Sequence, residues 1–279
     1  MKVYAVIGTP LQHSLSPLLH NSLLEAWDLP YVYIPWEIFP HELETAVEMF
    51  RRNFAGFNVT APHKQSIMPL LDGLNLSAEL YGAVNTVKNE NGKLIGYNTD
   101  GVGFLRGLDA VDYDLTGKRV LLLGAGGAAQ TVALELAHQG CAFTIANREV
   151  SRAYQLQVFL ERRFPGVDVE ITDITRIPRH PYNVVINATP VGMGALQGET
   201  PLASHYLQGV ELVYDLIYNP ASTKLLDQAR SAGCKTVNGL GMLVHQGLQA
   251  QEIWQEREVE QELEEQILQI IAKELYGHD

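Results

Sequence analysis

Short apolar runs rich in β-branched residues alternate with helix-like segments along most of this chain. A first series of strand-like runs, each followed by a helical pattern expected at 17–27, 41–53 and 64–71, comprises KVYAVIG (2–8), YVYIPWEI (31–38) and AGFNVT (55–60). A second series comprises KRVLLLG (118–124), CAFTIA (141–146), NVVINAT (183–189) and ELVYDLIY (211–218), with helices up to Gly140 and near 151–164. Alternation of this kind predicts parallel strands covered by helices, which is an α/β fold.

The pattern changes at two places. VNTVKNENGKLIGYN (84–98) is typical of two strands joined by an Asn-Gly turn, which is a hairpin and not a parallel pair. After Gly241 the strands stop and helical periodicity takes over, ending in the acidic run EVEQELEEQILQIIAKELYG (258–277), whose glutamates we interpret as a solvated helix face. Because the second series starts at 118, a domain boundary is expected near 100–116.

Composition excludes several classes of function. The 279 residues, 46% of them hydrophobic, suffice for two ordinary domains with substantial cores. The formal net charge of -12 argues against nucleic acid or an anionic membrane as the main partner. No run of about 18 apolar residues occurs and the start shows no signal-peptide core, so a cytoplasmic protein is expected. Cys141, Cys234 and the nine histidines show no metal or redox spacing, so we expect free thiols and no structural metal.

One glycine-rich turn lies between a buried strand and an amphipathic helix, in VLLLGAGGAAQTVALELA (120–137). Gly124, Gly126 and Ala129 match the G-x-G-x-x-[G/A] pattern, whose glycines allow a tight turn and let a pyrophosphate approach the helix N-terminus. In this strand–turn–helix context the pattern predicts dinucleotide binding. The alternative is a purely structural turn.

The residues about 20 positions further on indicate which dinucleotide is bound. An NAD enzyme offers an acidic residue to the ribose 2′-hydroxyl there, whereas this chain has Asn147 and Arg148, with Arg152 one turn later. Guanidinium groups suit a 2′-phosphate. Glu149 between the arginines opposes that interpretation, and ordinary solvated arginines are the alternative.

Polar side chains in the first hundred residues occur where strands should end and helices begin. Ser16 precedes Pro17 in HSLSPLLHN (13–21), a good N-cap arrangement, but capping does not explain Ser14. Two hydroxyls at a helix N-terminus could bind a carboxylate. Further polar groups follow other strands, and together they suit a small polyhydroxylated substrate at the carboxyl ends of the strands: Asn58, Thr60, Asn85, Thr86, Asn98, Thr99 and Asp100.

Lys64 is unusual within GFNVTAPHKQ (56–65). If a helix starts near Pro62, the lysine lies at the helix end that carries partial positive charge, where a cation is unfavourable. That position favours a role other than stability over a solvated lysine. Asp100, for which helix capping is the alternative, could pair with it.

Taken together, eight stretches resemble the motifs of the shikimate dehydrogenase family in order and spacing across nearly the whole chain. These are SLSPLLHN, NVTAPHK, GAVNTV, GYNTDG, GAGGAA, INATPVGM, YDLIYNP and NGLGMLVHQG. The resemblance implies a three-layer α/β substrate domain at 1–102, completed by the C-terminal helices 240–279. It further implies a Rossmann-type NADP domain at 103–239, with a cleft between the two.

The resemblance also implies roles for individual residues. Lys64 and Asp100 would form the catalytic pair. Substrate contacts are implied for Ser14 and Ser16 on a carboxylate, for Thr60, Asn85 and Gln246 on ring hydroxyls, and for Tyr218 at the mouth of the cleft. Cofactor contacts are implied for Gly124, Ala125, Gly126, Gly127, Ala128, Asn147, Arg148, Arg152, Thr189 and Gly239. The family's NADP motif is Asn-Arg-Thr, so Glu149 departs from it.

The function implied is the reversible NADPH-dependent reduction of 3-dehydroshikimate to shikimate in aromatic amino acid biosynthesis. A quinate/shikimate dehydrogenase with relaxed NAD or NADP use is one alternative, motivated by Glu149. A sensor that binds shikimate and nucleotide without turnover is another, although binding alone would not require both Lys64 and Asp100. The partners expected are a small-molecule substrate and NADP, without nucleic acid, membrane or metal; a homodimer is left open.

Overall fold

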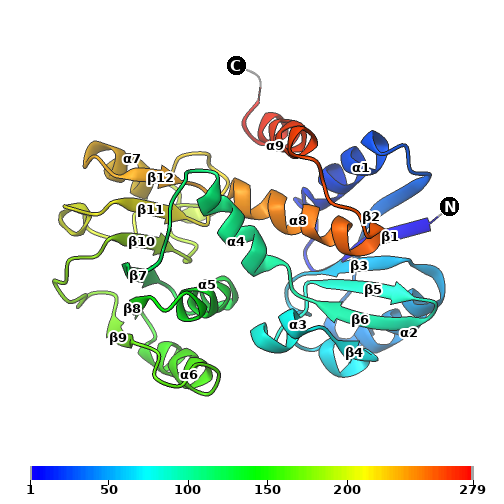
Figure 1. Cartoon of the computed structure of the whole chain (residues 1–279), viewed down its shortest axis with the longest axis horizontal. Helices are drawn as coiled ribbons and strands as arrows, with labels where there is room; N and C mark the ends of the chain where they lie inside the picture. Colours follow the sequence, from blue (N-terminus) through cyan, green and yellow to red (C-terminus); the bar gives the residue numbers. More distant parts are fainter. Residues whose placement is uncertain (1, 278–279) are drawn as a thin grey trace. The chain divides into compact units, whose positions relative to one another are not determined.

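The computed structural model describes residues 2–277, which contain two six-stranded sheets with covering helices (Figure 1). The chain divides into two compact units. The first comprises Met1–Gly103 and Val244–Asp279, and the second comprises Phe104–Leu243. The unit boundaries fall within the helices α4 (Asp100–Asp109) and α8 (Leu240–Gln255). Among the described residues, no helix combines the length and apolarity needed to span a bilayer.

The sheet of the first unit is mixed and has the strand order β2-β1-β3-β5-β6-β4. Its strands are β1 (Lys2–Gly8), β2 (Tyr31–Glu37), β3 (Gly56–Val59), β4 (Gly73–Leu74), β5 (Thr86–Glu90) and β6 (Lys93–Tyr97). β1 pairs in parallel with β2 and β3, whereas β5 pairs antiparallel with β3 and β6. The predicted hairpin is confirmed: Asn91 and Gly92 both have positive φ, 56° and 93°, as a two-residue hairpin turn requires.

Both faces of this sheet are covered, because successive residues of β1 alternate between them. Ala5 and Ile7 pack with side chains of α2 (Leu43–Asn53) on one face. Tyr4 and Val6 pack on the other face with side chains of α1 (Ser16–Ala26) and α8. The helix α9 (Gln261–Tyr276) contacts α1. The three-layer α/β prediction for this unit is therefore confirmed.

The helix predicted at 64–71 is wrong. Residues 64–67 form turns, followed by the short 3₁₀ helix η2 (Met68–Leu70). Pro69 lies in the middle of the segment, and its ring lacks an N–H and would clash with the carbonyl four residues earlier in an α-helix. Lys64 therefore does not lie at an α-helix N-terminus, and its position at a turn needs another explanation. The remaining short helices of this unit are η1 (Pro40–Glu42) and α3 (Leu76–Tyr81).

The sheet of the second unit is entirely parallel and has the order β12-β11-β10-β7-β8-β9. Its strands are β7 (Arg119–Leu123), β8 (Ala142–Asn147), β9 (Val169–Asp173), β10 (Val184–Asn187), β11 (Leu212–Asp215) and β12 (Lys235–Val237). Its helices are α5 (Gly127–His138), α6 (Val150–Glu161) and α7 (Lys224–Ser231), with the 3₁₀ helices η3 (Gly194–Leu196) and η4 (Ser204–Leu207). Numbered along the chain this order is 6-5-4-1-2-3, that of dinucleotide-binding folds, which confirms the Rossmann-type prediction.

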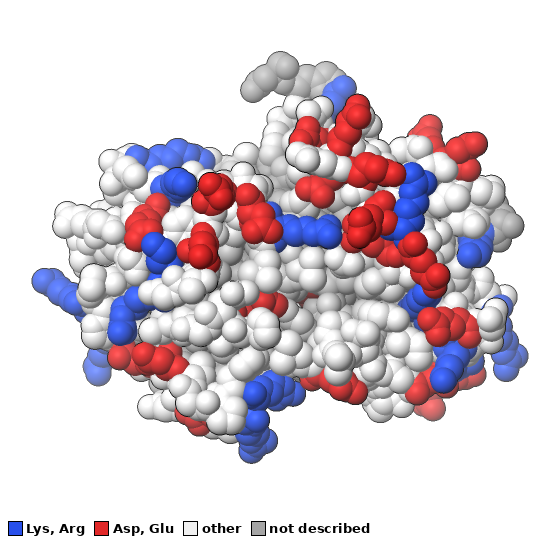
Figure 2. All heavy atoms as spheres, in the orientation of Figure 1, with Lys and Arg blue, Asp and Glu red and all other residues white. Residues whose placement is uncertain are grey.

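Charged side chains on the face drawn in Figure 2 are mixed in sign. Acidic and basic groups are interspersed there, and the basic side chains do not merge into one extended surface. A net charge of -12 is consistent with this distribution. The face shown therefore lacks the continuous positive potential that a nucleic-acid backbone requires.

Candidate active site

An ion pair in the first unit joins Lys64 to Asp100, the two residues predicted to be catalytic. Lys64 Nζ donates to Oδ2 of Asp100 at 2.5 Å. The lysine comes from the turn after β3, and the aspartate is the first residue of α4. The two side chains are 34% and 15% exposed, so the pair is held firmly while the ammonium remains accessible to a ligand.

Asn85 fixes the second oxygen of that carboxylate. Its buried amide Nδ2 donates to Oδ1 of Asp100 at 2.8 Å and to Oγ1 of Thr99 at 2.9 Å. In return Asn85 Oδ1 accepts from the backbone N–H of Thr99. Gln246 comes from α8, far along the chain, and its backbone carbonyl accepts from Thr99 Oγ1 at 2.8 Å. Four residues predicted from the sequence are thus linked by hydrogen bonds to each other or to the Asp100 carboxylate: Lys64, Asn85, Thr99 and Gln246.

A buried hydrogen-bond chain continues behind Asn85. Tyr33 Oη donates to Oδ1 of Asn58 at 2.7 Å, and Asn58 Nδ2 donates to Oγ1 of Thr86 at 3.0 Å. Thr86 Oγ1 donates in turn to Oδ1 of Asn85 at 3.0 Å. Sequence reasoning missed Tyr33, because it lies in an apolar strand pattern that gives no sign of a polar role.

Ser16 does not cap its helix, so the capping interpretation is wrong. It is the first residue of α1, the N-cap position is Leu15, and the cap has no side-chain hydrogen bond. The Ser16 side chain instead hydrogen-bonds to Tyr33, which partly offsets the strong rise in the pKa of Tyr33 caused by burial. Ser14 is half-buried in the same segment, and within residues 2–277 its hydroxyl has no hydrogen-bond partner. Ser14 and Ser16 follow the carboxyl end of β1, and Lys64 follows the carboxyl end of its parallel neighbour β3.

His20 is a buried residue that packs against Tyr33 of this hydrogen-bond chain. Its ring stacks on Tyr33 with 4.1 Å between the ring centroids, and Gln251 Nε2 lies 3.0 Å from its Nδ1. Burial lowers the pKa of His20 to about 3, against the opposing effect of the Asn58 side chain. The imidazole is therefore neutral near physiological pH and acts as a packing and hydrogen-bonding group.

Thr60 is brought to the same edge by a close approach of two strands. It follows β3, and its backbone N–H donates to Ile7 O at 2.9 Å. A Cβ at Gly8 would lie 2.4 Å from Cγ2 of Thr60, so the threonine can occupy this position only because residue 8 is glycine. Ser14 follows β1, and Thr60 and Lys64 follow β3, so these three residues come after the carboxyl ends of two neighbouring parallel strands.

In the second unit the glycine-rich turn has the geometry of a phosphate cradle. Gly124 has φ +109°, and a Cβ there would lie 3.0 Å from the carbonyl oxygen of Ala188. Gly126 is the N-cap residue of α5 without any side-chain cap, and a Cβ at Gly126 or Gly127 would meet nothing within 4 Å. The space beside these two glycines at the N-terminus of α5 is therefore open, and the first N–H groups of a helix have no partner within the helix, which suits a pyrophosphate. Ala125 and Ala128 lie in the same turn.

The charged residues after β8 are unevenly paired. Arg152 Nε lies 2.7 Å from Oε2 of Glu149, and Asn147 Nδ2 donates to the backbone oxygen of Glu149 at 2.8 Å. Arg148 is exposed, and among the described residues it has no ion-pair or hydrogen-bond partner. A 2′-phosphate bound after β8 would therefore lie near the unpaired guanidinium of Arg148 and near the Arg152–Glu149 pair, whose charges cancel.

The other predicted residues of the second unit lie in the loops after β10 and β11 or before α8. Thr189 donates to Oδ1 of Asn187 from its backbone N–H at 3.0 Å and from Oγ1 at 2.7 Å. A Cβ at Gly239 would lie 2.0 Å from Leu216 O, so this position requires glycine. Tyr218 is half-buried, and burial raises its pKa.

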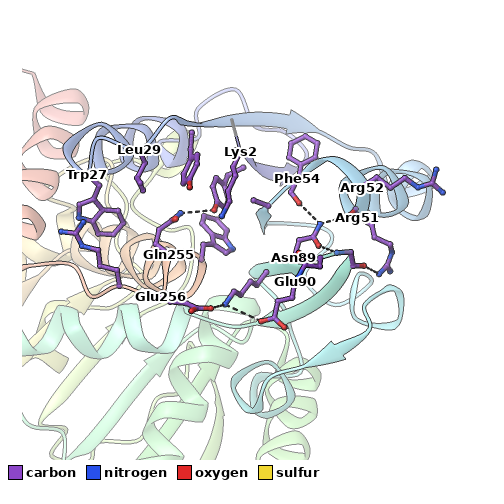
Figure 3. A pocket seen from close by; sticks show the side chains of 18 residues that line it. Lys2, Trp27, Leu29, Arg51, Arg52, Phe54, Asn89, Glu90, Gln255 and Glu256 are labelled. Atoms are coloured by element: carbon purple, nitrogen blue, oxygen red, sulfur yellow. Dashed lines mark hydrogen bonds and ion pairs between the residues drawn. The ribbon is translucent and has the colours of Figure 1, made fainter.

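A wide groove of about 1320 Å³ lies elsewhere on the first unit (Figure 3). It is lined by Lys2 and Tyr31, the first residues of β1 and β2, so it lies at the opposite edge of the sheet from Lys64. Most of its cations are engaged in ion pairs: Lys88 pairs with Glu256 at 2.6 Å, Arg257 pairs with Glu260 at 2.7 Å, and Arg51 pairs with Asp72. Figure 3 labels Glu256 and draws an ion pair to its carboxylate. The groove lacks a convergent set of available polar groups, so we assign the candidate active site to the edge with Lys64.

The groups beside Lys64 are an ammonium, a carboxylate, hydroxyls and amides, which suit proton transfer. Among residues 2–277 no three His, Cys, Asp or Glu side chains converge as metal ligands. Cys141 and Cys234 are buried free thiols, and burial raises the pKa of both, to about 11 for Cys141. Both are therefore protonated and unreactive near neutral pH.

Comparison with known proteins gives one consistent result. The family model described as "Shikimate dehydrogenase substrate binding domain" matches residues 6–87, and the one described as "Shikimate / quinate 5-dehydrogenase" matches residues 108–194. The NADP(+)-type shikimate dehydrogenase of Alkaliphilus oremlandii is 41% identical over 262 residues, 91% of this chain and 92% of that protein.

Solved structures give the same picture. A shikimate dehydrogenase crystallised with NADP+ has a TM-score of 0.93 and 38% identity, with 99% of this chain and 96% of that chain covered. The Listeria monocytogenes shikimate 5-dehydrogenase in complex with shikimate and NAD has a TM-score of 0.88 and 36% identity, with 96% of each chain covered.

Proposed function

Since this chain belongs to the shikimate dehydrogenase family, we propose that it catalyses the reversible NADPH-dependent reduction of 3-dehydroshikimate to shikimate, a step of aromatic amino acid biosynthesis. The observation that carries the proposal is the Lys64–Asp100 pair, 2.5 Å apart and held by Asn85 in a cluster of hydroxyls and amides. Two buried free thiols suit the reducing cytoplasm in which this pathway would run.

Lys64 acts on the oxygen of the reacting carbon. When bound, NADPH supplies the hydride that reduces the substrate carbonyl. The Lys64 ammonium stabilises the negative charge that develops on the carbonyl oxygen and gives it a proton, and in the oxidation direction the neutral amine takes that proton back. Asp100 orients the ammonium, and Asn85 holds the carboxylate in place.

Substrate recognition divides between two ends of the cluster. The hydroxyls of Ser14 and Ser16 bind the substrate carboxylate, with Ser16 held by Tyr33. Thr60, Asn85 and Gln246 bind ring hydroxyls. Because a carboxylate anchor is bound similarly in the ground and transition states, the serines set affinity while Lys64 sets the rate.

The second unit holds the cofactor. The turn Gly124–Ala128 binds the pyrophosphate at the α5 N-terminus, and Arg148 binds the 2′-phosphate with help from Asn147 and Arg152. Thr189 and Gly239 contact the nicotinamide half, and Tyr218 is assigned a contact with the substrate. The open space above Gly126 and Gly127 supports the pyrophosphate assignment.

A second candidate is a dehydrogenase that also accepts quinate and NAD. The observation in its favour is the ion pair between Glu149 and Arg152, which leaves Arg152 less available to a 2′-phosphate. A similar structure crystallised with NAD is consistent with it.

The experiment that tests both candidates is a set of four steady-state assays, shikimate or quinate with NADP or NAD, following absorbance of the reduced nicotinamide. We expect the highest kcat/KM with shikimate and NADP. A higher kcat/KM with quinate or NAD would establish the second candidate. No turnover with any pair, together with measurable binding of shikimate, would overturn the enzyme and leave a sensor.

A further inference from the structure

The last residue of β11, Asp215, is a fully buried carboxylate outside the cluster described above. Its side chain is 0% exposed. Oδ1 accepts from Asn187 Nδ2 at 2.9 Å and from the backbone N–H of Ile217 at 3.1 Å, and Oδ2 accepts from Thr223 Oγ1 at 2.6 Å. The carboxylate thus accepts three hydrogen bonds and donates none, which is the pattern of the ionised form.

This negative charge has no cationic side chain beside it among the described residues. Burial raises the pKa of Asp215, and the bonds from Thr223, Ile217 and Asn187 oppose that rise. Thr223 is also the N-cap of α7, where its Oγ1 accepts from the backbone N–H of Leu226. The charge is therefore stabilised by hydrogen bonds and a helix N-terminus and is not cancelled by a counter-ion.

Hydrogen bonds connect the Asp215 carboxylate to the segments that carry Thr189, Tyr218 and Gly239, three predicted site residues. Asn187, its amide partner, accepts from the backbone N–H and the hydroxyl of Thr189. The Asp215–Ile217 bond forms the turn that leads into Tyr218. Ile217 O accepts in turn from the backbone N–H of Gly239 at 3.0 Å.

The strand order indicates which half of a dinucleotide meets these loops. In a fold of order 6-5-4-1-2-3 the dinucleotide lies across the carboxyl ends of the strands at the switch point. The pyrophosphate turn follows β7 and the ribose-binding position follows β8, so the adenine half lies over β7 and β8. The nicotinamide half is left with the carboxyl ends of β10 and β11, where Asn187 and Asp215 are the last residues.

We propose that Asp215 is a positioning residue that supplies a permanent buried negative charge to the nicotinamide side of the cofactor site, and thereby favours binding of the oxidised over the reduced cofactor. The inference rests on the proposed dinucleotide site. The oxidised nicotinamide ring carries a positive charge and the reduced ring is neutral, so a fixed carboxylate attracts only the oxidised form. Holding the product form more tightly makes bound NADPH a stronger hydride donor than free NADPH.

The test compares equilibrium dissociation constants of NADP+ and NADPH for wild type and two variants, measured by calorimetry at neutral to mildly alkaline pH. Asp215→Asn keeps the shape and removes the charge. Thr223→Val is the matched control, because it removes a hydrogen bond from the same carboxylate and leaves the charge. We expect Asp215→Asn to reduce the preference for NADP+ over NADPH by about three- to tenfold, an order of magnitude typical of one partly screened charge. We expect Thr223→Val to change both constants by the same factor.

Three outcomes decide the matter. An unchanged NADP+ to NADPH ratio in Asp215→Asn, or equal shifts of that ratio in both variants, overturns the role of the charge and leaves Asp215 as a structural residue. Failure of wild type to bind either nucleotide overturns the proposed function itself and not this step alone. If Asp215→Asn does not fold, Asp215→Ser removes the charge with a smaller side chain. The same change in the ratio of the NADP+ and NADPH dissociation constants is then expected of Asp215→Ser.

Discussion

Nε of Arg152 lies 2.7 Å from Oε2 of Glu149, three residues earlier, at the start of α6. Ser151 Oγ adds a bond to the other carboxylate oxygen at 3.3 Å. The acidic residue that departs from the family's NADP motif is therefore turned toward its own helix and neutralises one arginine. Arg148 remains the guanidinium without a carboxylate partner among the described residues, so recognition of a 2′-phosphate rests mainly on it.

This pairing predicts unequal effects of the two arginines. Arg148→Ala should lower kcat/KM for NADP relative to NAD by about tenfold, since a hydrogen bond to a charged group is worth roughly 1.5 kcal/mol or more. Arg152→Ala should lower it less, because Glu149 already occupies that side chain. The measurement is the ratio of kcat/KM for NADP and NAD in each variant. Equal ratios in wild type and Arg148→Ala would contradict the assignment.

Releasing Arg152 should have the opposite effect. Glu149→Gln keeps the size of the side chain and removes the charge, so the freed guanidinium can reach the phosphate. We expect NADP binding to strengthen about three- to tenfold while NAD binding changes little, with the gain eroded by added salt because the charges are exposed. A calorimetric titration with both cofactors at low and high salt measures it. A gain that is equal for NAD and NADP would show that the freed Arg152 does not reach the 2′-phosphate.

Loss of the Lys64 ammonium should affect the rate of the chemical step. Lys64→Ala is expected to lower kcat by about two to four orders of magnitude, the usual range for a positioned acid or base, with a much smaller effect on KM. Steady-state kinetics at saturating shikimate measure this. Thr60→Ala is the control, because it removes a predicted substrate hydrogen bond on the same loop and should act mainly on KM. Near wild-type kcat in Lys64→Ala would remove the lysine from the mechanism.

The serine hydroxyls should act on affinity. Ser14→Ala and Ser16→Ala are each expected to raise KM for shikimate about tenfold or more with little change in kcat, because a hydrogen bond to a carboxylate is worth roughly 1.5–3 kcal/mol. Tyr33→Phe should raise KM less, since Tyr33 acts through Ser16. Melting temperatures of the same variants serve as the control. If Ser16→Ala lowers only the melting temperature, the hydroxyl is structural.

Buried His20 makes folding stability depend on pH. Its folded-state pKa is lowered to about 3, from an ordinary value near 6.5. Between pH 3 and pH 6.5 the unfolded chain therefore binds a proton at His20 that the folded chain does not. The free energy of unfolding consequently falls as pH drops below about 6.5 and continues to fall toward pH 3. One such group contributes about 1.4 kcal/mol of unfolding free energy per pH unit. His20→Gln should remove that slope between those limits. Urea unfolding of both proteins at several pH values measures it, and identical slopes would show that His20 is not the titrating group.

Local patterns predicted most of the elements that position the site. The Asn-Gly hairpin and the strand–turn–helix at Gly124 are encoded by neighbouring residues, so they were predicted and the structure confirms both. The helix predicted at 64–71 was wrong, because Pro69 in the middle of the segment prevents a continuous α-helix. β9 and β12 were missed, since VEITD and KTV are short and half-buried, without the apolar runs that mark central strands.

From the sequence alone came the α/β class, the dinucleotide turn and the polar types at the strand ends, because each of these depends on residues close together in the chain. Only the tertiary structure decided how those polar groups pair. Thr99 meets Gln246 across 147 positions and Tyr33 meets Asn58 across 25. Asp215 joins Asn187 because β10 and β11 are neighbours in register. Strand order and register set these distances, and the buried groups must find partners wherever the fold brings them, which no local periodicity records.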